Sequence, residues 1–140
     1  TSPPPFMTIF DAPNRDVCTV ARERTNTPLQ ALVLLNDPQF VEAAKALAGR
    51  VMAMSPKPED QVQYAFRLAT SKQPNEKESR VLMSLFQKEK EFYSKDTRAA
   101  EELLRVGEYQ VSSLKNKADL AAMTIVASTV LNHDATYMKR

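Results

Sequence analysis

The placement of glycine and proline constrains the fold of this 140-residue chain more than any other feature. Only two glycines are present, Gly49 and Gly107, and all nine prolines lie at or before Pro74. Tight β-hairpin turns depend on glycine, and proline interrupts the interior of a helix. The chain therefore favours helices over hairpins, and its second half can form long uninterrupted helices. We predict an all-α protein.

Six segments show the apolar spacing of amphipathic helices, with apolar residues recurring every three to four positions. Capping residues and prolines mark where most of these segments begin and end. The first segment is apolar on nearly every side. The last is apolar around most of its circumference, so we expect it at the centre of the bundle. The predicted helices are residues 28–35, 38 to before Pro56, 59–70, 75–93, 97–106 and 117–132.

Residues 1–24 show no sustained periodicity, and four prolines, at positions 3, 4, 5 and 13, keep the backbone extended or turning. We predict an irregular N-terminal segment over residues 1–24. Residues 25–140 should then form a bundle of about five to six helices. The chain begins at Thr1 with neither an initiator Met nor a signal peptide, which we interpret as a processed product or part of a longer chain.

The net charge and the length of the apolar runs argue against nucleic-acid binding and against a transmembrane segment. With 19 Lys and Arg against 17 Asp and Glu, the net charge of +2 is too small to indicate binding to nucleic acid or to an anionic membrane. Spanning a bilayer takes roughly 18 consecutive apolar residues, and no run in the sequence approaches that length. We therefore expect no nucleic-acid partner and no transmembrane segment.

The residues that usually carry chemistry are few. Cys18 is the single cysteine, which excludes an internal disulfide, a CxxC pair and a c-type haem attachment within these residues. We expect Cys18 to be a small buried hydrophobic residue. His133 has no second histidine at metal-ligand spacing, so a helix C-terminal cap or a surface position is its simplest role. We expect no metal site, no cofactor within this part of the chain, and no identifiable catalytic residue.

One polar cluster stands immediately before and within the first predicted helix. Arginine side chains and free N–H groups at a helix start both suit a carboxylate or phosphate, so the cluster is a candidate ligand site. The alternative is structural: the arginines pair with Asp11, Asp16 or Glu23, and the hydroxyl and amide side chains satisfy the helix end. We favour the structural interpretation. The candidate residues are Arg15, Arg22, Arg24, Thr25, Asn26, Gln30 and Asn36.

The same region resembles a planctomycete-specific domain of unknown function. The resemblance rests on residues 10–15 (FDAPNR), 22–32 (RERTNTPLQAL) and 35–38 (LNDP), and continues more weakly through 65–69 (AFRLA) and 131–132 (LN). In that family the domain lies at the C-terminal end of large exported proteins, often behind a cytochrome c-like haem domain. The resemblance implies no catalytic residues. It does imply that residues 25–140 are the C-terminal part of a larger domain.

Two functions follow as hypotheses. The first is a non-catalytic helical module of an exported or periplasmic multidomain protein, associated with a cytochrome c-like electron-transfer chain. Its partners would be upstream domains of the same chain, and a c-type haem would be bound elsewhere in that chain. The second is part of an enzyme site, or of an oxyanion or carbohydrate site, completed by upstream residues. Whether the whole protein is an enzyme stays open at this point.

Overall fold

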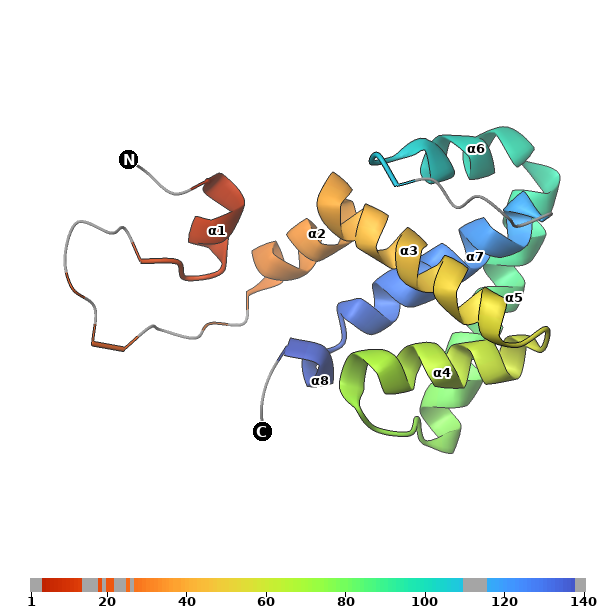
Figure 1. The fold of residues 1–140 in the computed structure, drawn as a ribbon, viewed down its shortest axis with the longest axis horizontal. Coiled ribbons are helices and arrows are strands. Elements are labelled where there is room, and N and C mark those ends of the chain that lie inside the picture. Colours follow the sequence, from red (N-terminus) through yellow and green to blue (C-terminus); the bar gives the residue numbers. More distant parts are fainter. Residues whose placement is uncertain are drawn as a thin grey trace.

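A computed structural model of the protein describes residues 4–13, 18, 20, 21, 25, 27–109 and 116–137. Over these residues the chain is all-α, as predicted, and contains eight helices and no strand. An arm of two helices, α1 and α2, projects from a compact bundle made by the others (Figure 1). The helices are α1 (Pro5–Ile9), α2 (Pro28–Asn36), α3 (Pro38–Met54), α4 (Pro58–Thr70), α5 (Glu76–Lys95), α6 (Thr97–Arg105), α7 (Lys117–Leu131) and α8 (Asp134–Tyr137).

Helices α2 to α7 are the six that the sequence predicts, whereas α1 and α8 were not foreseen. Both are shorter than two turns, so neither contains enough residues to show a helical period. For α1 the run of prolines suggested extended backbone. Pro5 instead occupies the first helical turn, where a missing N–H costs nothing. The N-terminal segment predicted to be irregular over residues 1–24 therefore contains one short helix, α1.

Two capping boxes fix the starts of α2 and α5. Thr27 Oγ1 accepts a hydrogen bond from Gln30 N at 3.3 Å, and Gln30 Oε1 accepts one from Thr27 N at 3.0 Å. At α5, Asn75 Oδ1 accepts from Glu78 N at 2.8 Å and Glu78 Oε2 accepts from Asn75 N at 2.7 Å. Each box satisfies two N–H groups that a helix start otherwise leaves without a partner. The box at Asn75 confirms the start signal in the sequence.

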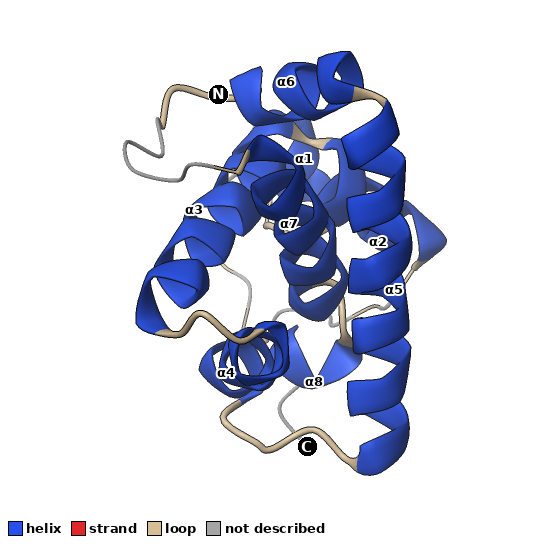
Figure 2. Ribbon diagram, turned by 90° about the vertical axis from the view of Figure 1, so that its right-hand side faces the viewer, coloured by secondary structure: helices blue, strands red, loops and turns tan. Residues whose placement is uncertain are grey.

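Helix α7 lies at the centre of the bundle, as predicted, with α3, α4, α5 and α6 around it (Figure 2). Several of its buried side chains are alanines, which allow neighbouring helices to approach closely, while Met123 and Val126 fill the core between them. Nearly all of its circumference is covered. Its buried residues are Leu120, Ala121, Ala122, Met123, Thr124, Val126, Ala127, Ser128 and Val130.

A buried lysine ties α3 to the end of α6. Lys45 is 2% exposed, and its Nζ donates hydrogen bonds to the carbonyl oxygens of Leu104 at 3.2 Å and Val106 at 2.6 Å. A cation is favourable at a helix C-terminus, where carbonyl groups lack helical partners. Gly107 follows in the left-handed region, with φ of 78°, and a Cβ there would collide with the Glu42 side chain. The predicted stop at Gly107 is confirmed.

The arm is joined to the bundle at two described points. The ring of Phe10, just after α1, lies 6.1 Å from that of Phe40 in α3, measured between centroids. Asn132, at the end of α7, donates from Nδ2 to the carbonyl oxygen of Ala31 in α2 at 3.4 Å. The base of the arm is therefore attached to the bundle. Among the described helices, none has the combination of length and apolar character that crossing a bilayer requires.

Candidate functional site

The polar cluster named as a candidate ligand site lies only partly within the described residues. Four of its members, Arg15, Arg22, Arg24 and Asn26, lie outside the described residues. The proposed anion clamp by arginines therefore stays a prediction. The other three members, Thr25, Gln30 and Asn36, are described, and their hydrogen bonds can be followed one by one.

Gln30 is the centre of a hydrogen-bond network that joins the two helices of the arm. Its side chain is nearly inaccessible, with only 4% of the residue exposed. Its Nε2 donates to the carbonyl oxygen of Ile9 at 2.9 Å and to Thr25 Oγ1 at 2.9 Å, while its Oε1 accepts from Thr27 N. Both amide hydrogens and the carbonyl oxygen of Gln30 thus have partners within the protein, which is the usual condition for burying a polar side chain.

Thr25 continues this network to Asp11. Thr25 donates to Asp11 Oδ2 twice, from its backbone nitrogen at 2.9 Å and from Oγ1 at 2.8 Å. Asn36 makes a separate bond within its own helix, from Nδ2 to the carbonyl oxygen of Leu32 at 2.8 Å. Thr25 and Gln30 therefore hold the arm together, whereas Asn36 bonds only within α2. For these three residues the hydrogen bonds fit the structural interpretation.

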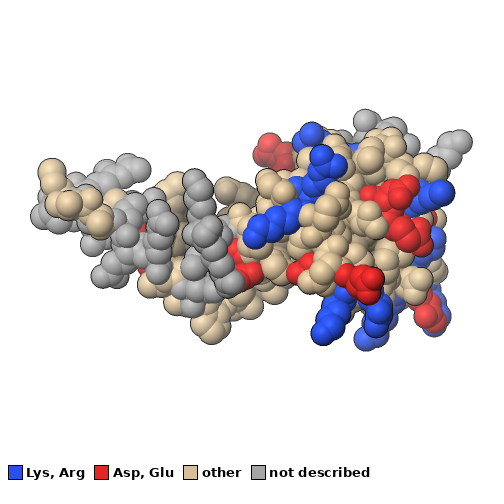
Figure 3. Space-filling view, turned by 90° about the horizontal axis from the view of Figure 1, so that it is seen from below, with Lys and Arg blue, Asp and Glu red and all other residues tan. Residues whose placement is uncertain are grey.

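The arm carries a continuous apolar surface, here called the leucine face, made by Leu29, Leu32 and Leu35. Their exposed fractions are 53%, 56% and 45%. Residues three apart are neighbours on a helix, so the three side chains form one stripe along α2. The opposite side of α2 is covered, since Gln30 is buried there. No residue of α2 is charged, and Figure 3 shows the charged side chains concentrated on the bundle rather than on the described part of the arm.

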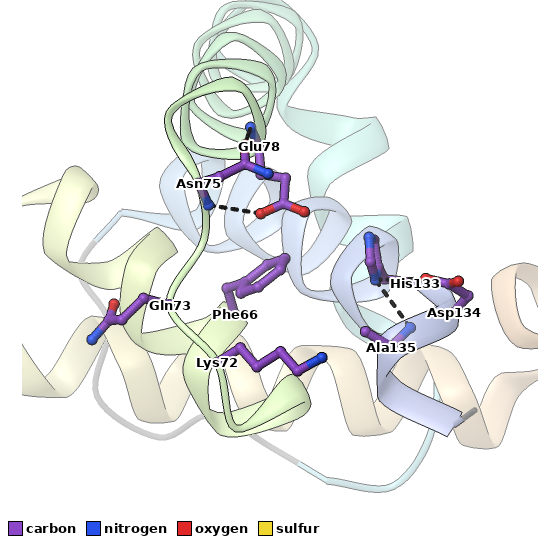
Figure 4. Close-up of a pocket in the computed structure, with 8 residues that line it drawn as sticks. All are labelled: Phe66, Lys72, Gln73, Asn75, Glu78, His133, Asp134 and Ala135. Carbon is purple, nitrogen blue, oxygen red and sulfur yellow. Dashed lines mark hydrogen bonds and ion pairs between the residues drawn. The ribbon is translucent and has the colours of Figure 1, made fainter. Parts of the chain in front are cut away.

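A second candidate site lies in the bundle where α4, the start of α5, the end of α7 and α8 meet. A polar cavity of about 350 Å³ opens there, with the Phe66 ring at its centre (Figure 4). An apolar cavity of about 280 Å³ adjoins it and shares Phe66, Glu78 and His133 with it. The polar cavity is lined by Phe66, Lys72, Gln73, Asn75, Glu78, His133, Asp134 and Ala135. The apolar cavity adds Lys77, Val81, Leu82, Thr129 and Val130.

His133 borders both cavities and also starts α8. Its Nδ1 accepts a hydrogen bond from Ala135 N at 3.2 Å, which requires a neutral imidazole with the proton on Nε2. Asp134 Oδ1 lies 3.3 Å from the same Nδ1, a contact that is favourable only when Nδ1 carries a proton. The two contacts therefore suit different protonation states, and the backbone bond is the one that builds α8. His133 caps the following helix rather than the end of α7, so of its two predicted roles the C-terminal cap is wrong, whereas its side chain is 38% exposed.

The charged side chains around the polar cavity differ in whether they already contact a partner within the protein. Glu78 is held by the capping box, and Asp134 lies against His133. Lys72 and Lys77 have no ion pair or hydrogen bond from their ammonium groups to any residue that the structure describes. The lysines are exposed. The lining of the two cavities thus holds two lysines and two carboxylates, and the lysine ammonium groups are the ones with no partner among the described residues.

No pattern in the sequence predicts these cavities. Their residues come from two segments about 50 positions apart, and each residue is individually ordinary for a helix or a loop. The prediction for Cys18 was also wrong, because that residue is exposed. Cys18 lies in the stretch between α1 and α2 and is not one of the residues of the two core clusters.

Comparison with known proteins places the chain in a family. A family model described as "PSD1: Protein of unknown function (DUF1553)" matches residues 1–86. The match covers more than half of the chain and includes the whole described arm, α3, α4 and the first part of α5. None of the curated proteins and none of the solved structures matches the chain. The protein therefore belongs to the PSD1 (DUF1553) family of proteins of unknown function.

Proposed function

We propose that this domain is a non-catalytic helical module that packs against another domain of the same protein through the leucine face of α2. The observation that carries the proposal is the exposure of Leu29, Leu32 and Leu35 on one side of an uncharged helix. A surface helix normally turns a polar face to water, and contiguous exposed apolar surface is typical of interaction sites.

The hydrogen bonds of the arm support this proposal, because they hold the leucine face in place. Gln30 is buried behind α2 and bonds to both Ile9 and Thr25, so α1 supports α2 from the side away from the leucines. A surface that is already ordered loses little conformational entropy when it binds. The arm also lies inside the residues matched by the family model, so it belongs to the part of the chain that the family shares.

The wider setting of the module is proposed from the resemblance described above together with family membership. We propose that the full protein is an exported or periplasmic planctomycete protein, and that the domain sits C-terminal to a cytochrome c-like domain that binds the haem. The upstream domains would then supply the surface that covers the leucine face. In this arrangement the module positions its neighbours and performs no chemistry of its own.

Limited proteolysis of the full-length protein tests the proposal. Leu32→Glu places a charge in the centre of the leucine face and should speed release of this domain severalfold, since burying an unpaired carboxylate is costly. Met54→Glu is the matched control, because Met54 is also 56% exposed but lies at the end of α3. The proposal is wrong if the Leu32 and Met54 variants are both cleaved at the wild-type rate.

A further inference from the structure

We propose that the two adjoining cavities bordered by Phe66 and His133 form one binding site for a small amphipathic anion. The ligand would have an apolar body and a single carboxylate. This site is distinct from the leucine face: it uses α4, α5, α7 and α8, and none of its residues belongs to the arm. It therefore stands whether or not the module docks through α2.

The apolar cavity suits a hydrocarbon body. Its inner wall is made by Phe66, Leu82 and Val130, which are 3%, 6% and 1% exposed and are therefore held firmly by the core. Val81 and the Thr129 side chain complete the rim. Ligand pockets commonly combine such a preformed apolar lining with a few polar groups at one end. The volume of about 280 Å³ limits the body to one ring or a short chain.

The side chains of the polar cavity determine whether the polar end of the ligand should be negatively or positively charged. Lys72 extends across it from the loop between α4 and α5, toward the start of α8 (Figure 4). Glu78 accepts a hydrogen bond from Asn75 N through Oε2, which holds this carboxylate at the helix start without neutralising its charge. His133 presents Nε2–H as a donor, because its Nδ1 accepts from Ala135 N. A cationic ammonium and an imidazole N–H are donors that recognise a carboxylate.

The edge-to-face contact between Phe66 and His133 lies where the polar and the apolar cavity meet. The ring centroids are 5.7 Å apart and the planes make an angle of 64°, an ordinary edge-to-face arrangement. Because both rings border both cavities, a ligand lying across them would place its apolar body over Phe66 and its carboxylate near His133. The geometry favours an anion of moderate length over a compact ion such as phosphate, which would leave the apolar half empty.

An NMR titration of the full chain with 4-phenylbutyrate tests the site. We expect saturable shifts in the signals of Phe66, Val130 and His133. The amine 4-phenylbutylamine should give no saturable shift there, because the ammonium group of Lys72 extends across the polar cavity and would repel it. Lys72→Met should weaken phenylbutyrate binding about fivefold, the effect of losing one exposed ion pair. Lys88→Met, an exposed lysine on α5 outside the cavities, should bind like the wild type.

A second variant tests the apolar half independently. Thr129→Phe adds a ring at the rim of the apolar cavity and should abolish the saturable shifts without unfolding the exposed end of α7. Shifts that rise without saturation, or that are unchanged in both Lys72→Met and Thr129→Phe, would overturn the proposal. Equal binding of the amine would overturn the assignment of the head group as an anion.

Discussion

At the scale of single residues, Gln30 explains why a polar cluster in a sequence need not be a ligand site. A glutamine with arginines and a threonine before a helix start is compatible with anion binding. In the structure its whole amide is occupied by Ile9, Thr25 and Thr27. The sequence predicted Thr27 as the helix cap, but not the bond that Thr27 N donates to Gln30 Oε1. The bond to Ile9 spans 21 positions and could not be inferred from local spacing.

Replacing Gln30 with methionine should loosen the arm while leaving the bundle folded. The change keeps the side-chain length and removes three hydrogen bonds, so the Ile9 carbonyl and the Thr25 hydroxyl lose a partner. We expect a cost of about 1–3 kcal/mol. Hydrogen exchange of α1 and α2 amides measures this cost. Gln39→Met, on the exposed start of α3, is the control and should not change exchange in the arm.

Lys45→Met tests the lysine that ends α6. The variant is nearly isosteric but leaves the carbonyls of Leu104 and Val106 without their donor. We expect the free energy of unfolding to fall by about 1–3 kcal/mol, as measured by urea denaturation. Lys88→Met should change it by less than about 0.5 kcal/mol, because Lys88 is exposed. Equal effects of the two substitutions would contradict a structural role for the buried ammonium.

Tyr93 gives the protein a defined response to alkaline pH. Burial, and to a lesser extent the charge of Glu89, raises the pKa of the Tyr93 phenol above its ordinary value of 10.0. The folded state thus favours the neutral phenol. This contribution to stability is complete below the pKa of the unfolded state, and it is lost as pH rises through the higher pKa of the folded state. Tyr93→Phe should therefore lose less stability than the wild type between pH 9 and about pH 11, measured by urea denaturation at each pH. Parallel curves would contradict the prediction.

At the scale of helices, the sequence predicted best where several local signals agreed. Helix α5 has an Asn75–Glu78 capping box followed by a long amphipathic stripe, and both are present in the structure. Helices α1 and α8 were missed because helices this short are stabilised by contacts with other parts of the chain, which a local sequence pattern does not show. The start of α8 depends on a side-chain bond from Ala135 N to His133, and no apolar period accompanies it. Periodicity cannot reveal elements of four or five residues.

Helix α7 should be the element on which stability depends most. Met123 is 0% exposed at the centre of the bundle. Met123→Ala removes three heavy atoms from a packed core and leaves a cavity, so we expect unfolding to become easier by about 2–5 kcal/mol. Met54→Ala at the exposed end of α3 is the matched control. A change below about 1 kcal/mol for Met123→Ala would show that α7 is not the packing centre.

At the scale of the whole molecule, the bundle and the arm present different problems to sequence analysis. The bundle follows from apolar stripes that bury one another, and its all-α class could be predicted from local pattern alone. The cavities beside His133 depend on how distant segments, residues 66–82 and 129–135, come together, so no local pattern contains them. The leucine face was visible in the sequence as a helix apolar on nearly every side. Which of its leucines stay uncovered depended on the packing of α3, α7 and α1 against it.

The most direct test of the central claim is amide hydrogen exchange of residues 28–36 in two samples. One is the full-length protein and the other is the 140-residue chain alone. If another domain covers the leucine face, exchange in α2 should be at least tenfold slower in the full-length protein, while α4 and α5 exchange equally in both. Tenfold corresponds to about 1.4 kcal/mol of added protection. Identical exchange of α2 in the two samples would contradict docking through Leu29, Leu32 and Leu35.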